Sequence, residues 1–243
     1  MFGDQGRVIW SITMRATMGR KRALLFAIPA VVLLLVTVLI KLAHPHDPSW
    51  PSQILGIFGF TVVLPLTALI IGTSVLGAEV DEGSIVHLLA TPVPRSVVIG
   101  SKYAVAVVLT VIFAAIPELV AGLIATGGAT KLALGVFVGA LAGSVMYNAV
   151  FVMLSAVTTR AIAWGLLYAL IWEGVLGNLV AGARLLSVGQ YSLGIANSIA
   201  HDPSLNAALG LPTAVILGAI VTAAGLVVAV RRLASFSLKG EPA

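Results

Sequence analysis

The chain has 243 residues, of which 59% are hydrophobic and only 9% are charged, and its mean hydropathy is +1.10. A soluble domain carries about 25% charged residues because it needs a polar surface, so the composition excludes an ordinary soluble protein and predicts an all-α membrane protein. The formal net charge is +5, but the basic residues are scattered between apolar runs, which favours membrane lipid over nucleic acid as a partner. The chain has no cysteine, so it forms neither disulfides nor thiolate metal sites.

The first predicted element covers residues 1–22, where apolar side chains such as Trp10 alternate with basic ones such as Arg15. This mixture is typical of an amphipathic helix that lies in the membrane interface. A frayed basic tail is the alternative. A cleavable signal is not expected, because the apolar run that follows is long enough to span a membrane.

Six apolar segments follow, and each approaches the roughly 20 residues that a helix needs to cross a bilayer. They cover residues 23–43, 54–78, 103–125, 132–157, 162–180 and 212–230. We therefore predict one membrane domain, residues 1–243, with six transmembrane helices.

Lysine and arginine set the predicted orientation. If the N-terminus is inside, eleven of the 14 basic residues lie in inner segments, and only Lys41, Lys131 and Arg184 lie outside. Inner loops of membrane proteins carry this excess of positive charge, so both termini are expected in the cytoplasm.

The long inner loop, residues 79–102, has an ordered pattern. Three carboxylates end the second span, a glycine breaks the helix, and two prolines stop the short stretch that follows. This order predicts a small helix at residues 84–90, lying parallel to the membrane at the cytoplasmic face; a solvated loop is the alternative. The residues that carry the pattern are Glu79, Asp81, Glu82, Gly83, Ser84, Leu88, Leu89, Pro92 and Arg95.

Two carboxylates, Glu118 and Glu173, lie inside predicted spans. A charge at the bilayer centre costs about 2.5–3.5 kcal/mol, so both residues need an explanation. In the functional interpretation they belong, with Trp172, to a translocation path or gate. In the structural interpretation they are carboxyl groups bonded to a neighbouring span. The sequence leaves both interpretations open.

Gly135, Gly139 and Gly143 repeat every four residues on the fourth span and predict a face that another helix approaches closely. The partner is either internal or a second copy of the chain. The outer residues 181–211 are semi-polar, which indicates short helices packed on the outer face rather than a free loop.

No enzyme is predicted, because none of the common catalytic motifs occurs. The polar residues of the outer loops are interpreted as turn residues near prolines, since a metal site needs three or four converging ligands. They are His44, His46, Asp47, His201 and Asp202.

The inner loop resembles the first intracellular loop of ABC-2 type ABC-transporter permeases. That family pattern has a carboxylate pair, Gly-Thr or Gly-Ser, two leucines, proline, a small residue, arginine and a later lysine, which is Lys102 here. Ser84 and Pro94 stand where threonine and serine are commoner. The stretch Trp172-Glu173-Gly174 and residues 182–191 are also similar to bacterial members.

The resemblance implies the membrane subunit of an exporter in the bacterial inner membrane, moving a drug, lipid or peptide-like substrate. The small inner helix would be the coupling helix, residues 1–22 the connecting helix, and residues 181–211 an outer gate. ATP and Mg²⁺ would bind a separate ATP-binding cassette subunit, because this chain lacks the Gly-x4-Gly-Lys-Ser/Thr motif. A second permease, identical or related, would complete the transporter.

Two other functions are compatible with an apolar bundle. One is an ATP-independent secondary transporter or channel that uses Glu118 and Glu173 as an ion relay. The other is an assembly or immunity protein without transport. The acidic inner helix favours the exporter, because an ATP-independent carrier has no need of such a projecting element.

Overall fold

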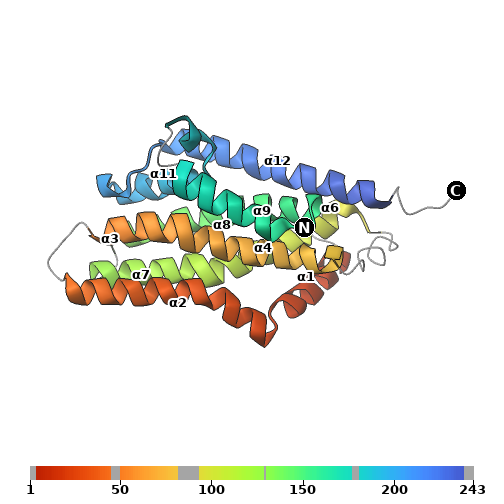
Figure 1. Ribbon diagram of the computed structural model, residues 1–243, viewed down its shortest axis with the longest axis horizontal. Coiled ribbons are helices and arrows are strands. Elements are labelled where there is room, and N and C mark those ends of the chain that lie inside the picture. Colours follow the sequence, from red (N-terminus) through yellow and green to blue (C-terminus); the bar gives the residue numbers. More distant parts are fainter. Residues whose placement is uncertain (1–3, 45–49, 82–92, 129, 177–180, 238–243) are drawn as a thin grey trace.

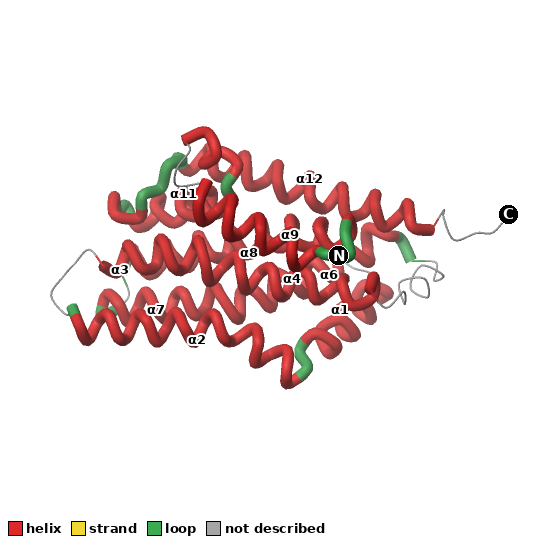
Figure 2. Tube along the Cα trace, in the orientation of Figure 1, coloured by secondary structure: helices red, strands yellow, loops and turns green. Residues whose placement is uncertain are grey.

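The computed structural model describes residues 4–44, 50–81, 93–128, 130–176 and 181–237. All regular structure in these ranges is helical, with no strand among them (Figure 2). The long helices run side by side along the long axis of the molecule, and α1 (Asp4–Thr17) lies across one end of them (Figure 1). The chain is therefore a helical bundle, as the composition predicts, and α1 packs against α6 at that end.

Five helices in the described ranges are long and apolar enough to cross a membrane. They are Arg22–Ala43, Trp50–Leu76, Arg95–Thr126, Lys131–Val157 and Leu211–Ser235. The predicted fifth span is represented by a shorter apolar helix, Ala161–Gly174, built from α9 (Ala161–Leu167) and the start of η3 (Tyr168–Leu176). The multi-pass helical fold is confirmed, whereas the count of six spans stays a prediction.

Most helix bounds lie near the predicted ones, as in α2 (Arg20–Ala43), α8 (Lys131–Val157) and α12 (Leu211–Ser237). The inner loop differs more. The second span continues to the end of α4 (Leu64–Asp81), and α6 (Arg95–Thr110) begins where the loop was expected to continue. Buried apolar residues such as Val98 and Ile99 explain why this part is helical.

Three of the predicted spans contain π-helical turns, which the sequence analysis did not predict; one of these is η3. Both η1 (Ile54–Val63) and η2 (Val111–Ala115) end two residues before a proline, Pro65 and Pro117 respectively. Proline lacks the N–H that would complete an α-helical turn and its ring crowds that turn, so a wider turn accommodates it. After η2 the chain continues as α7 (Ile116–Thr126).

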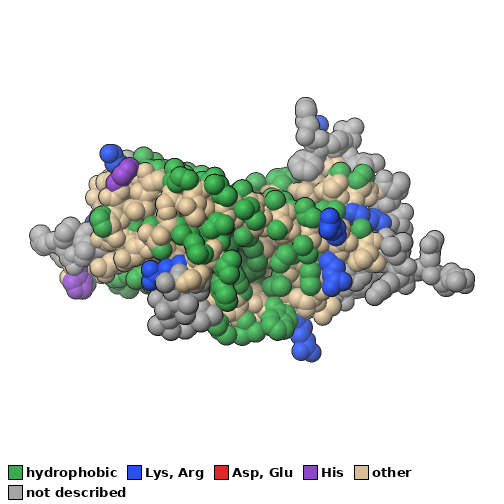
Figure 3. All heavy atoms as spheres, turned by 90° about the horizontal axis from the view of Figure 1, so that it is seen from above, with side chains coloured by type: hydrophobic (Ala, Val, Ile, Leu, Met, Phe, Trp, Pro, Cys, Tyr) green, Lys and Arg blue, Asp and Glu red, His purple; other side chains and the backbone are tan. Residues whose placement is uncertain are grey.

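The helix α8 forms the centre of the bundle and packs against α4, α7 and α12. By contrast, α2 and α12 leave much of their apolar surface uncovered. In the face seen in Figure 3, hydrophobic side chains gather across the middle, and Lys, Arg and His side chains lie nearer the two ends. A bilayer is the solvent in which such a surface is stable.

Candidate functional site

Residues 181–211, which the sequence analysis predicted on the outer side and which we call the outer segment, contain three short helices. They are the 3-10 helix η4 (Ala181–Leu186), the α-helix α11 (Val188–Ala200) and the 3-10 helix η5 (Pro203–Leu205). Of these, α11 runs antiparallel to α8 and penetrates the bundle. Its first turn lies beside Tyr147, because a Cβ added to Gly189 would lie 3.2 Å from the Tyr147 hydroxyl. Tyr147 is about 24 Å along α8 from Lys131, so α11 begins deep inside the protein.

Glu173 lies at the start of α11, with only 5% of its surface exposed. Its Oε1 accepts hydrogen bonds from the Tyr168 hydroxyl at 2.9 Å, from the Val188 N–H at 2.9 Å and from the Gly189 N–H at 3.3 Å. The Ser187 hydroxyl donates to Oε2, which also accepts from the Gly189 N–H at 3.3 Å. We call Glu173 and these four donor residues the Glu173 cluster.

This arrangement meets a requirement that arises wherever a helix begins inside a membrane protein. The first N–H groups of a helix have no partner within the helix, and water is absent there to supply one. A carboxylate satisfies them and is attracted by the positive end of the helix dipole. Glu173 therefore fastens the start of α11 to the shorter apolar helix that precedes it in the chain.

Two further bonds tie the same parts together. The Trp172 indole Nε1 donates to the Leu186 carbonyl at 3.3 Å, and the Tyr191 hydroxyl donates to the Leu185 carbonyl at 2.5 Å. Trp172 and Glu173, predicted as path or gate residues, thus both contact the outer segment.

The sequence analysis missed the other members of the Glu173 cluster. One of them has a recognisable pattern, because Ser187 followed by Gln190 matches the capping box of a helix start. Half of that box forms, since Ser187 Oγ accepts from the Gln190 N–H at 3.1 Å. The Gln190 side chain instead accepts from the Ala208 N–H at 3.0 Å and so holds the end of the outer segment. Tyr168 has no comparable pattern.

The glycine face of α8 lies against α11 of the same chain. A Cβ added to Gly139 would lie 2.6 Å from the Ser192 carbonyl oxygen and 2.7 Å from the Ala196 Cβ. At Gly135 the Ala196 carbonyl oxygen would lie 2.5 Å away, and at Gly143 the Ser192 Oγ would lie 2.6 Å away. Glycine is needed at Gly135 and Gly139 because backbone atoms of α11 occupy the space of a side chain, whereas side-chain atoms of Ser192 and Leu64 occupy it at Gly143.

Glu118, the second predicted path residue, has a different environment. It is the third residue of α7, follows Pro117 and is fully buried. Neither carboxyl oxygen has a hydrogen-bond partner among the described residues. It lies beside the π-helical Gly59, where an added Cβ would lie 3.4 Å from the Glu118 Cδ. Glu118 and Glu173 are therefore not members of one hydrogen-bonded site.

A cavity of about 660 Å³ lies between η1, α11 and η5. Polar side chains line much of it, including Arg184, Gln190 and Asn197. The loop beside it is held by Asp202, whose carboxylate accepts from the Ser52 hydroxyl and from the Ser204 N–H. Asp202 thus has a structural bonding role, and among the described residues no three His, Cys, Asp or Glu side chains converge as metal ligands.

Most of the predicted coupling residues, from Glu82 to Pro92, lie outside the described residues. Their neighbours are described: Glu79 and Asp81 end α4, and Arg95 begins α6. Within α6, the buried Lys102 donates from Nζ to the Val75 carbonyl at 2.8 Å and joins the two helices. The helices α4 and α6, which lie on either side of residues 82–92 in the chain, are therefore bonded to each other inside the bundle.

Comparison with known proteins agrees with this architecture. The sequence matches the family described as ABC-2 family transporter protein over residues 19–182, which is more than half of the chain. No curated protein matches it. The matched region begins just before α2 and ends in η4, so it includes Glu173 and the helices α4 and α6. The chain belongs to the ABC-2 family of transporter proteins and is a multi-pass membrane protein of that family.

Proposed function

We propose that this protein is the permease subunit of an ATP-driven exporter in a bacterial cell membrane, with both termini in the cytoplasm. The ATPase is a separate ATP-binding cassette subunit that carries ATP and Mg²⁺. Membership of the ABC-2 family is the observation that carries this proposal. The excess of inner lysine and arginine supports the orientation.

Residues 83–90 are the segment that contacts the ATPase in this proposal. They lie in the chain between α4 and α6. Because Lys102 of α6 is bonded to Val75 of α4, a movement of the segment would be transmitted to both helices. Leu88 and Leu89 are the apolar anchors, and burying each in a partner groove would gain about 1.5–3 kcal/mol. The carboxylates from Glu79 to Glu82 would orient the contact.

The outer segment is the gate in this proposal. The Glu173 cluster fixes the first turn of α11. The 660 Å³ cavity beside α11 is lined by polar side chains and opens toward the outer side in this proposal. A second permease, identical or related, is needed because one chain of this size encloses no path between its spans.

Purification of the tagged chain from its native membrane tests the proposal. We expect an ATP-hydrolysing subunit to copurify, and the double substitution Leu88→Asp and Leu89→Asp to release it or to uncouple hydrolysis from transport. The matched control is Leu185→Asp with Leu186→Asp, another adjacent pair, which is exposed in the outer segment. Normal transport by the Leu88 and Leu89 variant would contradict the coupling assignment, as would equal release of the ATPase by the control.

The ATP-independent carrier rests on one observation: Glu118 is fully buried and has no hydrogen-bond partner in the part of the chain that the structure describes. Such a group is a candidate for carrying an ion or proton in a membrane. The Glu173 carboxylate is a poorer candidate, because four donors already occupy it. Transport that continues without ATP and stops when Glu118 becomes Gln would favour the carrier over the exporter.

A further inference from the structure

A second cavity, distinct from the outer one, opens between α2, α4 and α9 and has a volume of about 630 Å³. This size lies within the roughly 300–1,000 Å³ of small-ligand sites. Its lining contains two arginines, Arg22 at the start of α2 and Arg160 just before α9. We call it the Arg22–Arg160 groove.

The remaining walls of the groove are apolar. Leu25 and Ile162 line it with more than half of their surface exposed, 53% and 59%. Three hydroxyls of the lining donate to carbonyls of their own helices: Thr73 to Leu69 at 2.7 Å, Ser74 to Ile71 at 2.8 Å, and Ser155 to Phe151 at 3.0 Å. These residues therefore present carbon rather than free polar groups to an occupant.

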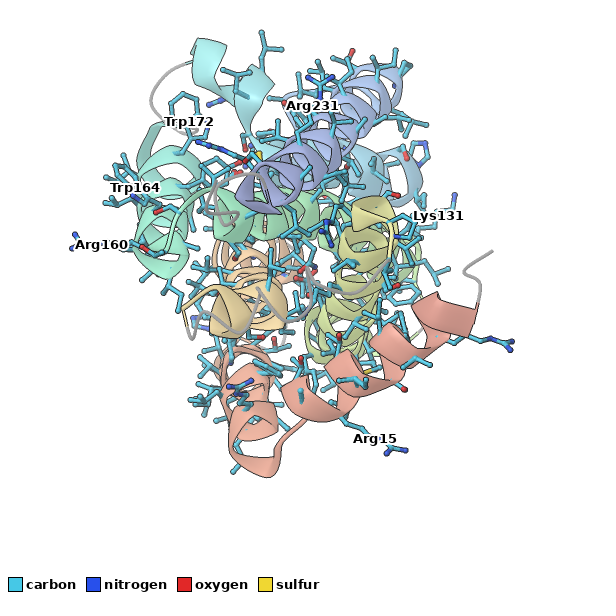
Figure 4. The ribbon with its side chains drawn as sticks, turned by 90° about the vertical axis from the view of Figure 1, so that its right-hand side faces the viewer. Arg15, Lys131, Arg160, Trp164, Trp172 and Arg231 are labelled. Atoms are coloured by element: carbon cyan, nitrogen blue, oxygen red, sulfur yellow. The ribbon has the colours of Figure 1, made fainter. Side chains whose placement is uncertain are left out.

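The two arginines have hydrogen-bonding capacity left. Arg22 makes one long bond, from Nη1 to the Ala16 carbonyl at 3.4 Å, whereas a guanidinium has five N–H donors. Arg160 is exposed and stands at the outer edge of the molecule beside the exposed Trp164 (Figure 4). No acidic residue is among the described residues that line the groove. A tryptophan beside basic groups is typical of the level of lipid headgroups.

We propose that the Arg22–Arg160 groove binds one anionic phospholipid of the surrounding leaflet. The headgroup phosphate lies between the two guanidinium groups, whose planar donors match phosphate oxygens. One acyl chain follows the wall formed by Leu25, Ile162 and Leu166. Charge complementarity selects this occupant over a second copy of the chain, because a two-fold contact through this groove brings the same arginines toward each other.

Native mass spectrometry of the full-length chain, released from nanodiscs of phosphatidylcholine and phosphatidylglycerol, tests the proposal. Wild type retains phosphatidylglycerol in preference to phosphatidylcholine. The variant with Arg22→Gln and Arg160→Gln loses roughly 30-fold in phosphatidylglycerol retention, as expected from about 1 kcal/mol for each basic residue near an anionic surface. Its retention of phosphatidylcholine is unchanged.

The control is Arg15→Gln, which removes an exposed arginine that points away from the bundle on α1 (Figure 4). Equal loss in the control overturns the proposal, and so does equal retention of the two lipids by wild type. A single cysteine at Ile162 gives the second measurement, since the natural chain has none. With a photoreactive label it crosslinks to phosphatidylglycerol; crosslinking to a second copy of the chain instead assigns the groove to a protein interface and overturns the proposal.

Discussion

Glu173 and Glu118 are both buried carboxyl groups in an apolar bundle, but their surroundings are opposite. Glu173 accepts from four donors and lies at the start of a helix, whereas Glu118 has no hydrogen-bond partner among the described residues and packs against Gly59. Burial and residue type are therefore not enough to assign a role. What differs is the number of polar groups that would be left unsatisfied if the carboxyl group were removed.

That difference changes the expected energetics. Removing one partner of a buried polar network exposes the others to the full cost of an unmade hydrogen bond, about 1–3 kcal/mol for each group. Removing a buried polar group that has no partner leaves nothing unsatisfied. The same substitution should thus weaken the protein at one position and spare it at the other.

Glu173→Ala should have the largest effect. It leaves the Val188 and Gly189 N–H groups and two hydroxyls without their acceptor, so we expect the free energy of unfolding to fall by about 1–3 kcal/mol for each group that stays unsatisfied. Unfolding of the full-length chain in detergent measures this fall. Glu173→Gln keeps the size and one acceptor oxygen and should lose less. A Glu173→Ala variant as stable as wild type would contradict the stabilising role of Glu173.

Gly139→Ala should come next, because it pushes α11 away from α8 without touching the carboxylate. The new Cβ would lie 2.6 Å from the Ser192 carbonyl oxygen, which is backbone and moves only with the helix. Overpacking of this kind costs about 1–3 kcal/mol of unfolding free energy. The control is Gly19→Ala, where nothing lies within 4 Å of the added carbon. Equal stability of the two variants would show that the α8–α11 contact is loose.

Glu118→Met should lower the free energy of unfolding by less than about 1 kcal/mol, or raise it. A side chain of similar volume replaces a carboxyl group that has no hydrogen-bond partner within the described ranges. The same unfolding measurement applies. If the variant is stable but no longer transports, Glu118 belongs to the path and the ATP-independent carrier gains support. A loss of several kcal/mol would mean that Glu118 has a structural partner.

Asp202→Asn should have the smallest effect. The hydrogen bond from Ser52 holds the pKa of Asp202 below its ordinary value of 3.8, so the bond stabilises the folded protein above that pH and is lost as the pH falls below it. The free energy of unfolding of wild type should therefore fall as the pH drops below 3.8, and Asp202→Asn should lack this part of the pH dependence. Identical pH profiles would contradict the assignment.

Hydropathy and charge predicted the helical membrane fold, since each long span has its own apolar run. The fifth predicted span corresponds to the shorter apolar helix Ala161–Gly174, because an apolar run does not by itself reveal where a helix ends. The π-helical turns before Pro65 and Pro117 depend on how neighbouring helices fill the wider turn. Glu173 was found because a carboxylate in a span is rare, but its donors come from residues that are close only after folding.

Hydrogen exchange of the amides of α11 is the most direct test of the central claim, that Glu173 and not Glu118 holds the start of the outer segment. In Glu173→Gln we expect peptides covering residues 187–200 to exchange faster than in wild type, with α8 unchanged, because local opening begins where a bond is lost. In Glu118→Gln these peptides should exchange as in wild type. Unchanged exchange in Glu173→Gln, or equal acceleration in both variants, would contradict the account.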